Sequence, residues 1–129
     1  MDTQTSPEAV VRRQLDAYNA RDLDGWLETY AEDARQYEFP AKLLATGHAE
    51  IRTRTASRLQ EPNIHAELLQ RAVIGNIVID HENVVRTFPE GPGRIEVTCI
   101  DEVRDGKIQA ASFVFGAKSL DSAQAPTAT

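Results

Sequence analysis

Residues 94–116 contain the pattern of two long strands joined by a tight turn. From Ile95 to Val103, apolar and polar residues alternate, which is the period of two that a strand with one buried face shows. Asp105 and Gly106 follow at once, and this pair suits a tight hairpin turn because glycine accepts a positive φ without steric cost. A second apolar run comes after the turn. The sequence therefore predicts an antiparallel hairpin around which the other elements must pack.

Asp101 interrupts the apolar face of the first of these strands. Its neighbours on that face are Val97, Cys99 and Val103, so the carboxylate would lie among apolar side chains. Burying a charge is costly unless it is paired, or neutral because its pKa has risen. Asp101 therefore marks either a pocket or a break in the register of the strand.

Three helices and several further strands are predicted before this hairpin. Apolar residues at helical spacing and helix-start signals such as Ser6-Pro7 locate the helices, and apolar runs between turn residues locate the strands. Gly75-Asn76 is predicted to form a two-residue turn, and the polar group at residues 80–83 to mark a bulge or a bend. The predicted helices are 7–20, 23–31 and 48–60, and the predicted strands are 35–39, 43–44, 64–74 and 77–88.

Composition limits the partners and the location that we expect. The 129 residues are enough for one domain, predicted at 1–118, with a disordered tail at 119–129. A net charge of −6 argues against nucleic acid or an anionic membrane as the main partner. With one cysteine there is no internal disulfide, and no secretory or membrane-spanning apolar segment is visible. We therefore expect a soluble cytoplasmic protein.

No motif with fixed catalytic spacing is present. We find no phosphate loop, dinucleotide fingerprint, nucleophile elbow or paired-histidine zinc helix, so neither a metal nor an organic cofactor is expected. Two polar features allow two interpretations each. Gln14 lies either at the edge of the first helix or with its amide in a cavity, and the arginines of the third helix form either a solvated face or an anion site.

Four short stretches carry a resemblance to a known superfamily. They are NARDLDG at 19–25, YAEDA at 30–34, GHAEI at 47–51 and DGKI at 105–108. With the order of the elements, they resemble the nuclear-transport-factor-2-like superfamily, and within it the SnoaL-like and ketosteroid isomerase-like proteins. The resemblance implies an α+β fold, in which a cone-shaped, curved antiparallel sheet wraps around three N-terminal helices (a cystatin-like α+β roll). It also implies a deep pocket and a homodimer through the convex sheet face.

The resemblance to ketosteroid isomerases also implies positions for catalytic groups. Those enzymes use a carboxylate base on the first strand, where Glu38 falls, and an oxyanion hole of a tyrosine and a protonated aspartic acid. Gln14 falls at the position of that tyrosine, and Thr55 at that of a second supporting tyrosine. Either Asp101 or Cys99 falls at the position of the acid. The expected catalytic residues are therefore Glu38, Asp101 and Gln14, with Thr55 and Cys99 lining the pocket.

The expected function is general acid–base chemistry of an isomerase, cyclase or lyase on a small, largely apolar carbonyl compound. A non-catalytic module that binds a small molecule in the same pocket is the alternative, and a protein whose main role is dimerisation is a third. The superfamily contains both enzymes and non-enzymes, so fold and function need separate arguments. The aromatic side chains expected in the pocket wall are Trp26, Tyr30, Tyr37, Phe39, Phe113 and Phe115.

Overall fold

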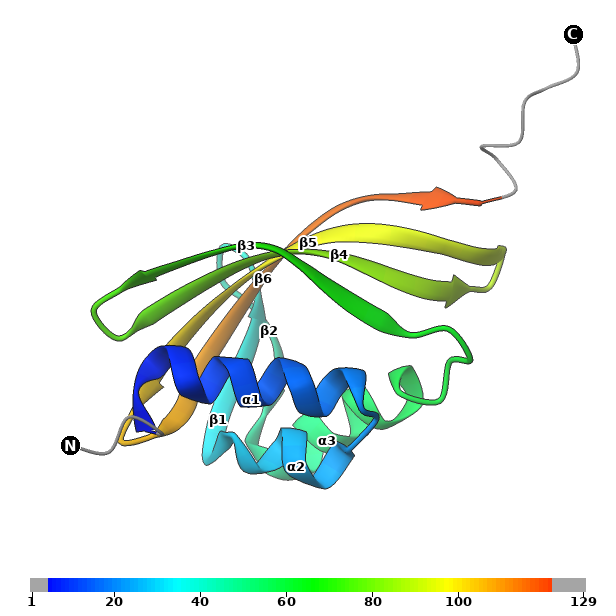
Figure 1. Cartoon of the computed structure of the whole chain (residues 1–129). Helices are drawn as coiled ribbons and strands as arrows, with labels where there is room; N and C mark the ends of the chain where they lie inside the picture. Colours follow the sequence, from blue (N-terminus) through cyan, green and yellow to red (C-terminus); the bar gives the residue numbers. More distant parts are fainter. Residues whose placement is uncertain (1–4, 122–129) are drawn as a thin grey trace, which may run out of the picture.

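The computed structural model describes residues 5–121, in which three helices lie on one face of a strongly twisted sheet (Figure 1). The sheet has six strands in the order β2-β1-β6-β5-β4-β3, and the predicted α+β architecture is confirmed. The elements are α1 (Pro7–Asn19), α2 (Leu23–Glu28), β1 (Tyr30–Glu38), β2 (Lys42–Thr46), α3 (Gly47–Arg58), β3 (His65–Ile74), β4 (Ile77–Phe88), β5 (Gly91–Arg104) and β6 (Lys107–Leu120).

The last four strands form the expected antiparallel meander, and β1 and β2 extend it at the β6 edge. Strand β1 runs parallel to β6, whereas every other neighbouring pair is antiparallel. The sheet is therefore mixed rather than purely antiparallel. This arrangement brings the start of β1 next to the residues that follow the last hairpin turn, because Tyr30 pairs with Ile108.

Helix α1 begins where its sequence signals predict. Ser6 is the N-cap, its Oγ accepts a hydrogen bond from the Ala9 amide at 3.3 Å, and Pro7 occupies the first turn, where no amide donor is needed. Val10 and Val11 are fully buried and hold the helix against the core. Helix α3 starts one residue earlier than predicted: Thr46 is its N-cap, and the Thr46 amide donates to the Glu50 carboxylate at 2.8 Å.

The second helix is shorter than predicted, and the strand that follows it is longer. Helix α2 ends at Glu28, and Tyr30 belongs to β1 rather than to a helical face. Thr29 separates the two elements: its Oγ1 donates to the Trp26 carbonyl at 2.6 Å, and its own carbonyl accepts from the Ile108 amide at 2.8 Å. Pairing with β6 thus competes successfully with the helical preference of these residues, a long-range effect that a local pattern does not contain.

The bulge or bend predicted at residues 80–83 is present in the pairing with the neighbouring strand. Residues 80–83 pair with β5 in an unbroken register, but opposite His81 and Glu82 the register of β3 shifts between Leu68 and Gln70. The polar residues of β4 do not break the strand because two of them, Asp80 and Glu82, turn their side chains into the protein interior. Strand β6 also runs to Leu120, past the predicted domain end, and residues 122–129 of the predicted tail lie outside the described residues.

Strand β3 exposes several large apolar side chains, among them Leu69 at 50% and Ile74 at 68%. The homodimer predicted through the convex face of the sheet stays a prediction.

No helix within residues 5–121 is long and apolar enough to cross a membrane.

Candidate active site

A cavity of about 120 Å³ lies between the sheet and the helices and is partly open to solvent. An engineered cavity of roughly 150 Å³ is known to hold a benzene ring, so the space suits a ligand built on about one ring. Its lining mixes aromatic, apolar and charged side chains. The lining residues are Gln14, Leu15, Tyr18, Trp26, Tyr30, Gln36, Arg54, Thr55, Arg58, Ala66, Glu82, Val84, Arg86, Ile95, Val97, Cys99, Phe113 and Phe115.

The sheet wall of the cavity carries a buried carboxylate, Glu82. Strand β4 alternates so that Val78, Asp80, Glu82 and Val84 all turn inward. Asp80 is only 1% exposed and is paired with Arg71 through two hydrogen bonds of 2.7 and 2.9 Å. Glu82 has no such cationic partner among the described residues, and it faces the cavity.

Burial and the neighbouring charge of Asp80 raise the pKa of Glu82 to about 7. The positive charge of Arg71 and a weak hydrogen bond from the Cys99 thiol, at 3.9 Å, offset part of this rise. A carboxyl group with a pKa near neutral pH is populated in both its acid and its base form, which is the property that general acid–base catalysis needs.

Cys99 and Asp101 lie on the inward face of β5, where they pair with Asp80 and Val78 of β4. Burial, followed by the charges of Asp80 and Glu82, raises the pKa of Asp101 well above its ordinary value. Burial and the charges of Glu82 and Asp101 likewise raise the pKa of the Cys99 thiol. The two residues differ in access: Cys99 lines the cavity, whereas Asp101, only 3% exposed, is not part of its lining.

Helix α1 contributes an amide and a hydroxyl one turn apart, Gln14 and Tyr18, which both line the cavity. Burial raises the pKa of Tyr18, against the opposing effect of Arg58. The start of β1 adds a second phenol, Tyr30, which is 2% exposed and whose ring lies 4.7 Å from that of Trp26. Burial and the charge of Asp101 raise the pKa of Tyr30 well above its ordinary value. Both phenols are therefore neutral hydrogen-bond donors.

Helix α3 adds two cationic side chains, Arg54 and Arg58, which line the cavity together with buried Thr55. Arg54 donates to the Gln36 side-chain oxygen at 2.6 Å. Gln36 is 1% exposed and comes from β1. The side of the cavity formed by α3 is thus positively charged, whereas the sheet side carries an acid.

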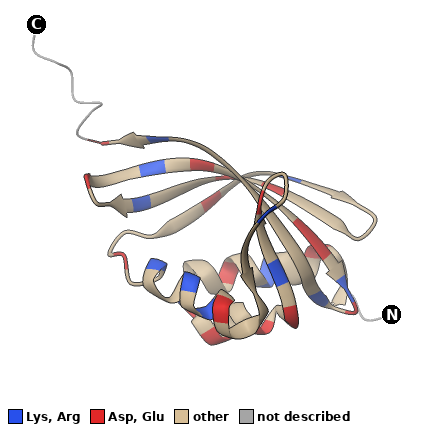
Figure 2. Ribbon diagram, turned by 180° about the vertical axis from the view of Figure 1, so that it is seen from behind, with Lys and Arg blue, Asp and Glu red and all other residues tan. Residues whose placement is uncertain are grey.

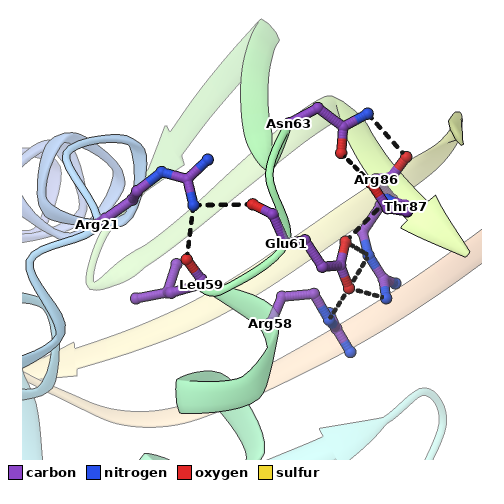
Figure 3. Close-up of polar contacts among 7 residues, drawn as sticks. All are labelled: Arg21, Arg58, Leu59, Glu61, Asn63, Arg86 and Thr87. Carbon is purple, nitrogen blue, oxygen red and sulfur yellow. Dashed lines mark hydrogen bonds and ion pairs between the residues drawn. The ribbon is translucent and has the colours of Figure 1, made fainter.

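The segment between α3 and β3 is fixed by a polar network, shown in Figure 3. The Glu61 carboxylate accepts hydrogen bonds from two nitrogens of Arg86, from Nε at 3.0 and 3.2 Å and from Nη2 at 2.7 Å, and one more from the Thr87 amide at 2.9 Å. Burial would raise the pKa of Glu61, but these hydrogen bonds and the charges of Arg86 and Arg58 outweigh it and lower the pKa. Arg21 also donates to the Leu59 and Glu61 carbonyls at 2.8 Å. The network holds the end of α3 against β4 beside the cavity.

Glu61→Gln should lower the free energy of unfolding by about 2 kcal/mol, because hydrogen bonds to a charged partner contribute roughly 1.5–3 kcal/mol. Urea denaturation at pH 7 measures the loss. Glu90→Gln is the matched control, since Glu90 pairs with Lys118 on the surface, where solvent screens such pairs and they contribute little to stability. Equal losses in the two variants would contradict the structural role of the Glu61 network.

The structure brings together many of the residues expected in the pocket but not all of them. Glu38 is half-buried at the end of β1, in register with Phe113 and Lys42, and it is not among the lining residues. Tyr37 and Phe39, the latter 56% exposed, are also outside the lining. The catalytic roles of Glu38, Asp101 and Gln14 stay predictions. The expected residues that do line the cavity are Gln14, Trp26, Tyr30, Thr55, Cys99, Phe113 and Phe115.

Sequence reasoning missed Glu82 and Tyr18, and it left an anion-binding role of the α3 arginines open. A signal for Glu82 was present, because Val78, Asp80, Glu82 and Val84 keep the period of two through the polar group of β4. The described residues contain no group of three or more His, Cys, Asp or Glu side chains placed to hold a metal ion.

Solved structures of several proteins have the same fold. A cystatin-fold protein from Novosphingobium aromaticivorans is 22% identical, with a TM-score of 0.77 over 84% of this chain and 97% of the other. A candidate ketosteroid isomerase from Kribbella flavida is 20% identical, with a TM-score of 0.71 over 86% and 78%. A candidate polyketide cyclase from Sinorhizobium meliloti is 26% identical, with a TM-score of 0.66 over 81% and 92%.

No curated protein sequence matches the chain. A family model does: residues 11–111 match the SnoaL-like domain, which covers most of the sequence and most of the cavity wall. The chain therefore belongs to the SnoaL-like domain family.

Proposed function

We propose that the protein is an enzyme that moves a proton by general acid–base chemistry on a small carbonyl compound, with Glu82 as the group that carries the proton. The observation behind this proposal is a buried carboxyl group on the cavity wall whose pKa is about 7. Two similar structures, a candidate ketosteroid isomerase and a candidate polyketide cyclase, agree with chemistry next to a carbonyl group.

In the proposed reaction, the Glu82 carboxylate removes a proton from the carbon next to the carbonyl group. The electrons of the broken C–H bond form a carbon–carbon double bond, and negative charge develops on the carbonyl oxygen. Neutral phenols, Tyr18 and Tyr30, are available to donate hydrogen bonds to that oxygen. Protonated Glu82 then returns its proton to a different carbon in an isomerisation. A positioned acid–base group contributes about 10²- to 10⁴-fold to such a rate.

Isomerisation of 3-cyclohexen-1-one to its conjugated isomer, a reaction of a single six-membered ring, gives a first assay by absorbance. Exchange of α-protons in D₂O, followed by NMR, extends the test to other small ketones. We expect Glu82→Gln to lower kcat about 10²-fold or more. The wild-type kcat/KM should rise with pH through about 7, as Glu82 ionises, and this dependence should disappear in the variant.

Glu38→Gln is the matched comparison, because the resemblance to ketosteroid isomerases gives that carboxylate the role of the base. We expect its turnover to stay near that of the wild type, since Glu38 is not part of the cavity lining. If Glu38→Gln abolishes turnover and Glu82→Gln does not, the proton carrier is on β1 and our assignment is wrong.

A module that binds a small molecule without catalysis is the second candidate. The position of Glu38 outside the lining favours it, because the base expected on the first strand then does not reach the ligand. It predicts that ligands raise the melting temperature of the protein while no tested ketone exchanges protons faster than it does without protein.

A further inference from the structure

Arg54 is a partly buried cation without an anionic partner. Its guanidinium lies on the cavity and donates to the neutral oxygen of Gln36 at 2.6 Å, and no carboxylate within residues 5–121 forms an ion pair with it. Burial and the positive charge of Arg58 lower the pKa of Arg54, yet an arginine side chain stays charged in proteins. A desolvated positive charge without a counterion is costly, which leaves a stabilising place for an anion.

Arg58 adds a second positive charge four residues further along the same face of α3. Like charges at this spacing destabilise a helix. The blue bands along α3 in Figure 2, which mark Lys and Arg, show how closely the positive charges of this helix follow one another. The carboxylate nearest to Arg58, Glu61, is 3.9 Å away and is already bound by two nitrogens of Arg86. Neither Arg54 nor Arg58 is therefore fully compensated by an acid of the described chain.

Trp26 provides an independent observation. Its indole Nε1 is the one buried side-chain nitrogen or oxygen atom in residues 5–121 that lacks a hydrogen-bond partner. The side chain is 3% exposed and lines the same cavity. A buried N–H group without an acceptor has lost its hydrogen bond to water without a replacement, and an oxygen atom of a bound ligand would supply one.

The rest of the cavity wall indicates the size and polarity of the other part of the ligand. Val84, Ile95, Val97 and Phe113 give the sheet side an apolar surface, and the volume of about 120 Å³ suits about one ring. The charges that act most on Glu82 come from Asp80 and Arg71 rather than from the α3 arginines. The third arginine of the lining, Arg86 on β4, is paired with Glu61, so the positive charge without a close acidic partner is that of Arg54 on α3. A suitable ligand therefore has one anionic end and one compact apolar body.

We propose that the cavity takes a small organic acid, whose carboxylate lies against Arg54 and Arg58 and whose apolar body lies on the sheet wall toward Glu82. Only the statement that this acid is the substrate rests on the function proposed above; its binding does not. The planar fork of arginine matches the two oxygens of a carboxylate, and Trp26 offers its N–H to an acceptor oxygen. With a net charge of −6, the protein as a whole does not attract anions, so a preference for an acid must come from these groups.

Benzoate and benzamide are the probes, because they share a shape and differ in charge. Trp26 is the only tryptophan of the chain and lines the cavity, so its fluorescence, excited at 295 nm, reports binding of either molecule. At pH 7 we expect benzoate to bind the wild type about tenfold or more tightly than benzamide, which corresponds to about 1.4 kcal/mol. Benzamide binding as tight as that of benzoate would overturn the proposal.

Variants of α3 assign the preference to its residues. Arg54→Gln should bring the Kd of benzoate close to that of benzamide, and Arg54→Lys should restore part of the difference. Arg52→Gln is the matched control, since Arg52 lies on the same helix but pairs with Asp24 on the surface. If Arg52→Gln weakens benzoate binding as much as Arg54→Gln does, or if inorganic phosphate alone binds as tightly as benzoate, the organic-acid site is wrong.

The same measurements separate this inference from the proposed reaction. Glu82→Gln should bind benzoate at least as tightly as the wild type, because the carboxylate of the ligand is expected at α3 and the variant removes negative charge from the cavity. Retained preference for benzoate together with turnover that does not need Glu82 would reject the catalytic proposal and support the acid site. Turnover that needs Glu82, in a protein that does not prefer benzoate to benzamide, would support the catalytic proposal and reject the acid site.

Discussion

Replacing Glu82 with glutamine should stabilise the folded protein by about 3 kcal/mol at pH 8, although it removes a charge from the proposed active site. Burial raises the pKa of Glu82 from 4.5 to about 7. Between pH 4.5 and about pH 7, Glu82 is protonated in the folded state but ionised in the unfolded state. The free energy of unfolding of the wild type therefore falls as the pH rises through this range, and above about pH 7 it falls no further on account of Glu82. At about 1.4 kcal/mol per pKa unit, the difference corresponds to about 3 kcal/mol.

Urea denaturation gives the free energy of unfolding of the wild type and of Glu82→Gln at pH 4.5 and pH 8. The effect is the change, between the two pH values, in the difference between the two proteins. Near pH 4.5 the two proteins should be close in stability, because Glu82 is protonated in the folded state and glutamine resembles the protonated acid. Glu67→Gln, at an exposed position on β3, is the control and should change little at either pH. A Glu82→Gln difference that is the same at both pH values would show that this carboxyl group titrates normally.

Arg71→Met should lower the free energy of unfolding by about 3–5 kcal/mol at pH 8, because it leaves the Asp80 carboxylate buried without its partner. Asp80 is 1% exposed, receives both of its 2.7 and 2.9 Å hydrogen bonds from Arg71, and lies close to Glu82 and Asp101. Thermal or urea denaturation measures the loss.

The double variant Arg71→Met/Asp80→Val tests whether the loss comes from the unpaired charge. Replacing both partners of a buried ion pair with apolar residues is often neutral or stabilising, so the double variant should recover most of the stability that the single variant loses. Two results would contradict this account of Arg71 as the partner that compensates the buried charge of Asp80. One is a loss of less than about 1 kcal/mol in Arg71→Met, and the other is a double variant that is no more stable than the single one.

Local patterns were enough to predict most of the fold. The cap of α1 and the turns at Gly75-Asn76 and Asp105-Gly106 are short-range features, and the structure confirms each of them. The predicted end of α2 is wrong, because Tyr30 is drawn into β1 by pairing with Ile108, which lies far along the chain. A choice between helix and strand that depends on a distant partner leaves no mark in the surrounding residues.

The site was harder to predict than the fold for a physical reason. The polar residues 80–83 interrupt an apolar pattern and predict a bulge or a bend, yet β4 stays regular toward β5, because Arg71 on the neighbouring strand offsets the cost of burying Asp80. Whether an alternating carboxylate such as Glu82 points into a cavity depends on which elements cover the sheet. Similarly, the lining role of Arg54 depends on where α3 lies over β1, and one helix considered alone does not show it.

The parallel pairing of β1 with β6 has a consequence for how the chain folds during synthesis. Residues 35–38 pair with residues 110–113, so this contact closes a loop of more than half the chain. Until β6 has left the ribosome, β1 and β2 have no neighbour that joins them to the meander, and the cavity lacks Phe113 and Phe115. Contacts between such distant segments form slowly, so the nascent protein completes the cavity only after β6 has been synthesised.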